Sequence, residues 1–342
     1  MDDKRRKSRS ILLTAFVVLV ILWIFKLSHP QFSFFPAHGG HELTSTTPEP
    51  AENQVKENGA SRSGKWKTRP ANPQALSTDV FNGTITNKAA VIIETRFRTN
   101  IIPLILHFSS VLGYSWPIII YTAPESLGEF STSAALAHYV KSKTIQIRTL
   151  PQTVFFTNSD SVSKFMTDKW IWEDLAPAEH ILTFQSDSML CSNAARSVDD
   201  FFEYDLIGAP IKPEAGKGYN SGLSLRKRST VLRILEEWDW KETKTDEDRF
   251  EDRWYLNKMK MLQERQTVAG ISPNDAGIIN LPSIEVARTF SVEAIDYPHP
   301  LGVRQVHKWE EKQLAPLEEW CPEYKLCRED PTIDPPPKDP PK

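Results

Sequence analysis

The sequence lacks the charge pattern of a nucleic-acid-binding protein. Its 342 residues include 41 lysines and arginines against 44 aspartates and glutamates, which gives a net charge of -3 at pH 7. No basic stripe runs through the body of the chain, although such a stripe is the usual footprint of a surface that binds DNA or RNA. We therefore expect no nucleic-acid partner.

The chain also has few cysteines and lacks the common hydrolase motifs. Its three cysteines form no CxxC pair and join no histidine cluster, which argues against a zinc site. Cys321 and Cys327 are close enough in sequence to form a disulfide in an oxidising compartment, which would leave Cys191 as a buried, small apolar side chain. Neither Gly-x-Ser-x-Gly nor His-Glu-x-x-His occurs, so a membrane-anchored hydrolase is the weakest function class that we consider.

The N-terminus, in contrast, carries a long apolar run. Five basic residues precede the apolar residues from Ile11 to Phe25, which Thr14 interrupts once. A helix over residues 11–27 would be about 25 Å long, close to the thickness of the thin bilayer of the early secretory pathway. Because no convincing signal-peptide cleavage site follows, we favour an uncleaved anchor. The preceding basic residues orient the N-terminus to the cytosol and the rest of the chain to the lumen of the Golgi or ER.

Composition divides the remainder of the chain. The region after the anchor is rich in Pro, Ser, Thr, Gly, Asn and Glu and reads as a flexible stem, in which Asn82-Gly-Thr84 would be an N-glycosylation acceptor. The Pro-rich C-terminus is expected to be disordered. We expect five segments, namely a cytosolic tail (1–10), a transmembrane anchor (11–27), a stem (28–86), one folded domain (87–328) and a tail (329–342).

Strand and helix patterns alternate within the folded domain. The predicted strands are at residues 89–94, 116–121, 144–148, 181–187, 205–210 and 289–293. The predicted helices are at residues 101–112, 131–141, 162–175 and about 251–263. A strand, a helix and a further strand in succession imply a parallel βαβ unit. The sequence therefore predicts an α/β domain with a mostly parallel sheet, helices on both faces, and shorter, mixed strands in its later half.

Three polar segments follow one another along this domain. Ile181-Leu-Thr-Phe-Gln-Ser-Asp187 is a strand that ends in a lone acid, at the edge where open α/β sheets bind ligands. Asn220-Ser-Gly222 is a turn that lets the backbone approach a ligand closely before a strand resumes. Glu251-Asp252 stands at the start of a helix, where the helix dipole alone would also favour acids. Sugar transfer from a nucleotide donor requires this set of parts.

This ordered combination resembles the GT-A glycosyltransferases. More narrowly, it looks like a mainly fungal and microbial family of unknown function, made up of type II membrane proteins that are regarded as probable glycosyltransferases. The resemblance covers residues 89–327 and implies a GT-A-like fold, but it supplies no substrate. The segments that carry it are Trp172-Glu, Phe184-Gln-Ser-Asp-Ser, Tyr204-Asp-Leu-Ile-Gly-Ala-Pro210, Asn220-Ser-Gly-Leu-Ser-Leu-Arg226, Glu251-Asp252, Phe290-Ser-Val-Glu293 and Trp320-Cys-Pro-Glu-Tyr-Lys325.

The resemblance implies a metal site. In GT-A enzymes the last acid of an Asp-x-Asp motif binds Mn²⁺ or Mg²⁺ through the donor diphosphate. Asp187 matches that acid, while Gln185 stands in the place of the first acid, where an amide is a poorer metal ligand. GT-A enzymes often add a C-terminal histidine, for which we choose His307 over His299.

The resemblance also implies roles for the other polar residues. Arg96 and Gln185 would contact the nucleotide, and Asn220 and Gly222 would border the sugar. Asp252, with Glu251 beside it, would act as the general base that takes the proton from the acceptor hydroxyl. The implied protein is a lumenal, metal-dependent glycosyltransferase that uses a UDP- or GDP-linked sugar and a glycan or glycoconjugate acceptor.

A catalytically silent protein is the alternative. Such a lumenal protein would keep the fold for binding or scaffolding, and the amide of Gln185 in place of an acid leaves this hypothesis open. A cleft that gathers Asp187, Asn220 and Asp252 would favour the enzyme, whereas scattered positions would favour the scaffold.

Overall fold

The computed structural model describes residues 84–98, 100–212, 214, 218–271 and 277–328. The predicted cytosolic tail, anchor and C-terminal tail, nearly all of the predicted stem, and the acceptor asparagine Asn82 lie outside these residues. In the described part of the chain, no helix has both the length and the apolar character that crossing a membrane requires.

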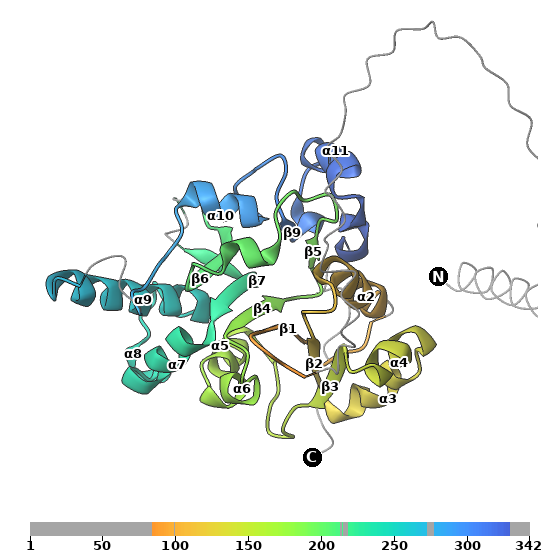
Figure 1. Cartoon of the computed structure of the whole chain (residues 1–342), viewed down its shortest axis with the longest axis horizontal. Helices are drawn as coiled ribbons and strands as arrows, with labels where there is room; N and C mark the ends of the chain where they lie inside the picture. The colour runs from red at the N-terminus through yellow and green to blue at the C-terminus, as the bar shows by residue number, and fades with distance from the viewer. Residues whose placement is uncertain (1–83, 99, 213, 215–217, 272–276, 329–342) are drawn as a thin grey trace, which may run out of the picture. The chain divides into compact units, whose positions relative to one another are not determined.

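A six-stranded sheet forms the centre of the fold, with its strands in the spatial order β3-β2-β1-β4-β7-β6 (Figure 1). The strands, in chain order, are β1 (Lys88–Ile93), β2 (Ile118–Thr122), β3 (Ile145–Thr149), β4 (His180–Phe184), β6 (Leu206–Pro210) and β7 (Tyr219–Lys227). The first four are parallel, β7 is antiparallel to β4, and β6 is antiparallel to β7. The predicted α/β class with a mostly parallel sheet is therefore confirmed.

A second, smaller sheet has the order β5-β9-β8. It consists of β5 (Ser188–Leu190), β8 (Ser291–Val292) and β9 (Gly302–Arg304). β9 packs against β7 so closely that a Cβ at Gly302 would overlap the side chain of Leu223. Because β5 begins one residue after Asp187, this contact brings the C-terminal part of the chain to the end of β4.

Helices cover both faces of the large sheet. The α-helices are α2 (Ile101–Leu112), α3 (Leu127–Ser131), α4 (Ala134–Lys141), α5 (Ser159–Met166), α6 (Lys169–Asp174), α7 (Arg228–Glu237), α8 (Trp240–Thr243), α9 (Glu251–Val268), α10 (Ile284–Phe290) and α11 (Glu311–Trp320). Short 3₁₀ helices are η2 (Pro124–Ser126), η3 (Val198–Phe201), η5 (Val306–Lys308) and η6 (Pro322–Cys327). α2 packs on one face through Phe108, whereas α6 and α9 contact Tyr121 and Arg226 on the other.

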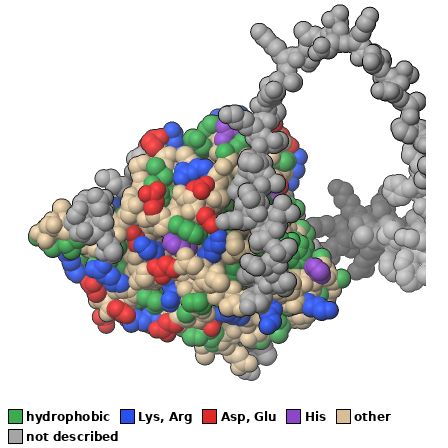
Figure 2. Space-filling model, viewed as in Figure 1, with side chains coloured by type: hydrophobic (Ala, Val, Ile, Leu, Met, Phe, Trp, Pro, Cys, Tyr) green, Lys and Arg blue, Asp and Glu red, His purple; other side chains and the backbone are tan. Residues whose placement is uncertain are grey.

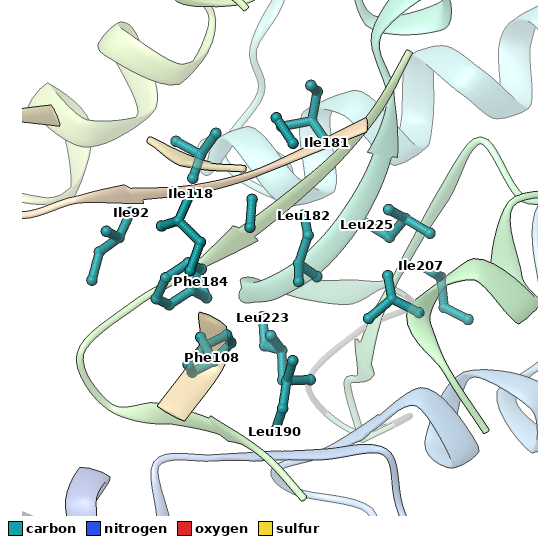
Figure 3. Packing of buried hydrophobic residues seen from close by; sticks show 14 of the residues in the cluster. Ile92, Phe108, Ile118, Ile181, Leu182, Phe184, Leu190, Ile207, Leu223 and Leu225 are labelled. Carbon is teal, nitrogen blue, oxygen red and sulfur yellow. The ribbon is translucent and has the colours of Figure 1, made fainter. Parts of the chain in front are cut away.

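Strand alternation separates an apolar face from a more polar one. Leu182 and Phe184 of β4 pair with Leu225 and Leu223 of β7, and Phe108 of α2 stacks on Phe184 with ring centroids 3.9 Å apart (Figure 3). Burial of such a side chain stabilises the fold by about 1.5–3 kcal/mol. The alternate residues of the same strands, such as Thr183, point to the opposite face, where polar groups meet α6 and α9.

Several predicted elements differ from those observed. The strand predicted over 181–187 is β4, which ends three residues before Asp187, and the helix predicted to end at about residue 263 continues to Val268. The single helix predicted over 162–175 is two helices, α5 and α6, because the side chain of Asp168 accepts a hydrogen bond from the Trp170 amide and caps a new helix. Ser133 likewise caps α4, so the helix predicted over 131–141 begins later, after α3. The strand predicted over 289–293 is only Ser291–Val292, since the residues before it end α10.

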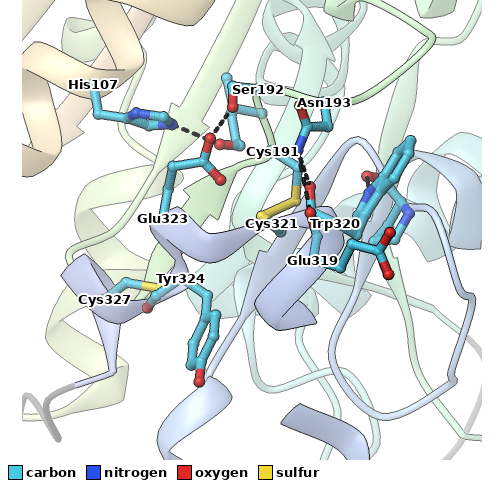
Figure 4. Close-up of a disulfide and its surroundings, with 12 residues drawn as sticks. His107, Cys191, Ser192, Asn193, Glu319, Trp320, Cys321, Glu323, Tyr324 and Cys327 are labelled. Atoms are coloured by element: carbon cyan, nitrogen blue, oxygen red, sulfur yellow. Dashed lines mark hydrogen bonds between the residues drawn. A yellow bond between two sulfur atoms is a disulfide. The ribbon is translucent and has the colours of Figure 1, made fainter. Parts of the chain in front are cut away.

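The predicted disulfide between Cys321 and Cys327 is wrong. Cys191 pairs with Cys321 instead, with a Cα–Cα distance of 4.8 Å and a sequence separation of 130. Cys327 is free and buried, and Figure 4 shows it on the far side of η6 from the disulfide. Cys321 caps η6 and Cys327 is its last residue, so this helix holds the two apart, while the end of β5 brings Cys191 beside the end of α11.

Candidate functional site

The ends of three strands meet at one edge of the large sheet. Gln185 directly follows β4, and its amide donates a hydrogen bond of 2.9 Å to the carbonyl of Gly222 on β7. Glu94 directly follows β1, and its amide donates to the carbonyl of Tyr121 on β2. Because β7 is antiparallel, its first residues reach the edge where the parallel strands end. This is the edge at which open α/β sheets bind their ligands.

Arg304 of β9 connects the residues at this edge. One terminal nitrogen, Nη1, donates to Glu293 at 2.9 Å, and the other, Nη2, donates to the side-chain carbonyl of Gln185 at 2.9 Å. Nη2 also lies 3.5 Å from Oδ2 of Asp187. A Cβ at Gly222 would overlap Nε of Arg304, so any other residue there would have to displace the Arg304 side chain. The structure therefore gathers Gln185, Asp187 and Gly222 around one buried guanidinium.

Arg304 and Glu293 were not among the predicted site residues. Glu293 belongs to a segment that carries the family resemblance, and Arg304 lies three residues before His307, but neither position has a local pattern that indicates an ion pair. The pairing depends on β8 and β9 lying side by side in the small sheet. Strands of two and three residues leave too little periodicity for such an arrangement to be read from sequence.

Asp187 and His307 each carry an unpaired polar atom. Asp187 is only 4% exposed, and its Oδ1 has no hydrogen-bond partner. Nδ1 of His307 in η5 is also buried without a partner. The amide of Gln305 donates to the carbonyl of Asp187 at 2.8 Å, which holds the segment that leads into η5 beside the end of β4. A buried polar atom without a partner is costly, and a bound ligand or ion is one way to satisfy it.

Both atoms are of kinds that can ligate a divalent cation. Among the described residues, no three His, Cys, Asp or Glu side chains gather in a group that could hold a metal. A cation bound together with substrate phosphates needs fewer protein ligands, because phosphate oxygens and water complete its shell. The carboxylate of Asp187 and the imidazole of His307 are suitable ligands for Mn²⁺, and the amide of Gln185 is already occupied by Arg304.

Glu94 fixes the backbone beyond β1. Its side chain accepts a hydrogen bond of 3.1 Å from the Arg96 amide and another from Ser186, which lies between Gln185 and Asp187. Burial raises the pKa of Glu94, while the Arg96 amide and the positive charge of Arg98 act in the opposite direction. Arg96 is half-buried at this edge, next to the residues that follow β4.

The acid pair at the start of α9 divides into two different environments. Glu251 is 4% exposed and forms an ion pair with Arg226 of β7, with Nη1 3.1 Å from Oε2. Asp252 is half-buried, and its Oδ1 accepts from the Arg253 amide. Burial, and next the negative charge of Glu251, raise the pKa of Asp252 to about 6. Glu251 thus forms an ion pair with Arg226. Asp252, in contrast, can take up or release a proton near neutral pH.

Strand β7 joins the two halves of the site. Ser224 and Arg226 alternate along it and therefore point to the same face, whereas Gly222 lies where the pairing of β7 with β6 is irregular. Gly222 packs on Arg304, and Nε of Arg226 donates to Ser224 Oγ at 3.2 Å before its terminal nitrogens reach Glu251. Asn220 is the second residue of the same strand, and its side-chain carbonyl accepts from the Gly222 amide at 2.9 Å. The contacts recorded for the described residues connect Asp187 to Asp252 through β7 and not directly.

Substitution of Gly222 by alanine tests the packing of Arg304. The added Cβ would displace the guanidinium and weaken its contacts with Gln185 and Glu293, so we expect the free energy of unfolding to fall by about 1–3 kcal/mol. Gly128→Ala is the matched control, since no atom lies within 4 Å of a Cβ at that position. Urea denaturation measures both variants, and equal stability of the two would contradict the contact.

Comparison with known proteins gives one family match and several distant structures. Residues 144–304 match the model of a family described as "Protein of unknown function (DUF5672)". No curated protein matches the chain. The glycosyltransferase GlyE of Streptococcus pneumoniae TIGR4 is 14% identical, with a TM-score of 0.37, over 72% of this chain and 61% of that one.

Two further structures are similarly distant. The apo form of GlyE is 13% identical, with a TM-score of 0.35, over 66% of this chain and 57% of that one. A mannosyltransferase of Pyrobaculum calidifontis, PcManGT, in complex with GDP-Man and Mn²⁺, is 10% identical, with a TM-score of 0.35, over 58% of this chain and 55% of that one. The chain thus spans less than two thirds of each of these glycosyltransferases. Between residues 144 and 304 it is similar to a family whose description assigns no function.

Proposed function

We propose that the chain is a glycosyltransferase that moves a sugar from a UDP- or GDP-linked donor to a hydroxyl of a glycan or glycoconjugate. The observation that carries the proposal is the gathering of Gln185, Asp187 and Gly222 around Arg304 at the ligand-binding edge of the sheet. Strand β7 continues from this cluster to the ion pair beside Asp252. Contacts through Arg304 and β7 thus link Asp187, Gly222 and Asp252.

The donor would occupy the edge around Asp187. Asp187 and His307 would hold Mn²⁺ or Mg²⁺, because each has a buried atom that lacks a partner. A bound cation neutralises the charge that develops on the leaving diphosphate. Arg96 and the Gln185 amide would border the nucleotide. Asn220 would contribute its NH₂ group to the sugar, since its carbonyl oxygen is taken by the Gly222 amide.

Asp252 would act as the general base. Its pKa of about 6 leaves it ionised at neutral pH yet able to accept a proton. The acceptor oxygen attacks the anomeric carbon, and the bond from that carbon to the diphosphate oxygen breaks. The acceptor proton passes to Asp252, and the bond electrons leave with the diphosphate. This single displacement inverts the configuration at the anomeric carbon, as expected when one carboxylate acts as base and none as nucleophile.

The Cys191–Cys321 disulfide supports a lumenal location. Disulfides persist in oxidising compartments and are rare in the cytosol. Together with the predicted anchor at residues 11–27, it favours a type II protein of the Golgi or ER membrane. On the face in Figure 2, acidic and basic side chains are interspersed. Such a surface suits a neutral glycan acceptor without strong electrostatic attraction.

Nucleotide titration tests the proposed function. The purified full-length chain, in a mild detergent, is titrated by calorimetry with UDP and with GDP, each with and without MnCl₂. We expect one nucleotide to bind in the presence of Mn²⁺, and Asp187→Ala to weaken that binding at least about 10-fold, as loss of a metal ligand does. If a folded chain binds neither nucleotide, the silent scaffold becomes the better hypothesis. Turnover is then measured as the release of UDP or GDP from the corresponding nucleotide sugar.

A further inference from the structure

Phe250 is an exposed aromatic residue at the start of α9. It is the N-cap of this helix, has an extended backbone and makes no side-chain cap hydrogen bond. Phenylalanine is a poor N-cap, because its side chain cannot accept a hydrogen bond from the first helical amides as Ser, Thr, Asp or Asn would. Its side chain is also 37% exposed, so burial compensates only in part. Local stability therefore does not explain a phenylalanine at this position.

The residues on either side of Phe250 are held by polar contacts. Arg249, which precedes it, donates from Nη2 to Asp160 of α5 at 2.8 Å. Glu251, which follows it, forms the buried ion pair with Arg226 of β7. The guanidinium of Arg249 also lies over the Phe250 ring, 5.2 Å from its centroid. The ring is thus carried by a backbone that is attached to α5 on one side and to β7 on the other, and a surface that is already ordered loses little entropy when a ligand binds.

Phe250 is close to the proposed base. The Cα atoms of residues 250 and 252 are at most about 7 Å apart, because only two peptide units separate them. An acceptor hydroxyl that gives its proton to Asp252 has to come within about 3.2 Å of that carboxylate. The acceptor group that carries this hydroxyl therefore lies beside the start of α9, where Phe250 is exposed.

The side chains around the ring suit a saccharide. The face of an aromatic ring carries partial negative charge and attracts weakly positive C–H groups. A pyranose ring presents C–H groups on its faces and hydroxyls at its edge. Arg249 and Asp160, whose side chains are 52% and 41% exposed, supply a donor and an acceptor for such hydroxyls. An aromatic face flanked by half-exposed charged groups is thus complementary to a sugar ring.

We propose that Phe250 is a stacking platform for a sugar ring of the acceptor, so that the group which receives the transferred sugar is itself a saccharide. This inference rests on the proposed function, because Asp252 as the base locates the acceptor hydroxyl. It narrows the acceptor from any glycoconjugate to one that presents a sugar at its end. Binding of a glycan requires no turnover and can be measured separately from the reaction.

Saturation-transfer difference NMR of the full-length chain, in a detergent without a sugar head group, tests the proposal. The probes are maltose, cellobiose, lactose, chitobiose and mannobiose, each at about 10 mM, above the usual range of KM. Each is measured with and without UDP or GDP and MnCl₂. We expect at least one disaccharide to bind, with the strongest saturation on the C–H protons of one ring face.

Phe250→Leu removes the aromatic face and keeps an apolar side chain. We expect the dissociation constant of the bound disaccharide to rise at least about 5-fold, as truncation of an aromatic contact at the centre of a binding site does. Phe250→Tyr keeps the ring and should bind as the wild type does. Tyr114→Leu is the matched control, because Tyr114 is 70% exposed and lies between α2 and β2, at the opposite edge of the sheet. Thermal melts check that each variant is folded.

Two results would overturn the proposal. One is a folded wild-type chain that binds none of the five disaccharides, and the other is a Phe250→Leu protein that binds them as tightly as the wild type. Either result leaves nucleotide binding, and with it the proposed function, to be judged by the titration with UDP and GDP. A chain that binds no nucleotide but binds a disaccharide through Phe250 would instead lose the proposed function and keep the sugar site, as a scaffold that binds glycans.

Discussion

Asp252→Asn is expected to lower the turnover number by about 10²–10⁴-fold and to leave nucleotide affinity unchanged. Asparagine keeps the size of the side chain but cannot accept the acceptor's proton, and general-base catalysis contributes rate enhancements of that order. Steady-state kinetics with the donor identified by titration measure the turnover number, and calorimetry measures the affinity. Asp246→Asn, which alters an exposed acid shortly before α9, is the control and should be silent.

The dependence on pH gives this prediction a second readout. Because the ionised form of Asp252 is active, kcat/KM of the wild type should fall as the pH decreases below about 6, the pKa to which burial and the charge of Glu251 raise this carboxyl. The residual activity of Asp252→Asn should lack that dependence. A wild-type profile that stays flat to pH 4.5 would assign the base to another residue.

The raised pKa of Asp252 also predicts that Asp252→Asn is more stable than the wild type. The folded chain binds the proton of Asp252 more tightly than the unfolded chain does, so stability falls as the pH rises from about 4 to about 6, and the loss persists above it. Asparagine carries no charge, and Asp252→Asn should therefore be roughly 1–3 kcal/mol more stable than wild type at pH 8. Urea denaturation should show the difference shrink at pH 4.

Cys321→Ser is expected to reduce the free energy of unfolding by about 5 kcal/mol, the largest stability effect that the structure predicts. The disulfide closes a loop of 130 residues, and loop-closure entropy makes long loops the most stabilising. Denaturant titration with and without a reductant measures the effect. Reductant should destabilise the wild type and leave the variant unchanged.

Cys327→Ala distinguishes the observed pairing from the one that the sequence suggests. Cys327 is buried and free, so its loss should cost only the packing of a small side chain, and the variant should remain sensitive to reductant. A disulfide between Cys321 and Cys327 would give the opposite pattern. Cys191→Ser would then be nearly silent, and Cys327→Ala would be insensitive to reductant.

Local patterns predicted the parts of the fold that local forces determine. β1 and α2 match their predicted ranges within one residue, because each is an apolar run with clear ends. The strand that leads to Asp187 was also predicted, although β4 ends at Phe184 and Asp187 lies in the turn that follows it. The split between α5 and α6 was missed because the competing signal is a single capping side chain, Asp168.

The central residue of the site could not be predicted in this way. Arg304 reaches Gln185 across 119 positions of sequence, and Cys191 reaches Cys321 across 130. Both contacts require the small sheet to form and to pack on β7. Its strands are too short to show a periodic sequence pattern, so this packing cannot be predicted from the sequence. The sequence also could not predict that Glu251 forms an ion pair and Asp252 does not. That difference depends on Arg226, which lies on another element, β7.

The pairing of β7 on both sides has a mechanical consequence. β4 pairs with Leu223–Lys227 of this strand and β6 with Ser224–Arg226, whereas Gly222 lies where the register between β6 and β7 shifts. The groups that contact its two ends are carried by β9 and α9, which are joined to it by side chains. The end of the strand beside Glu251 is therefore fixed by backbone pairing on both sides, whereas the position of the end beside Arg304 depends more on the packing of that side chain.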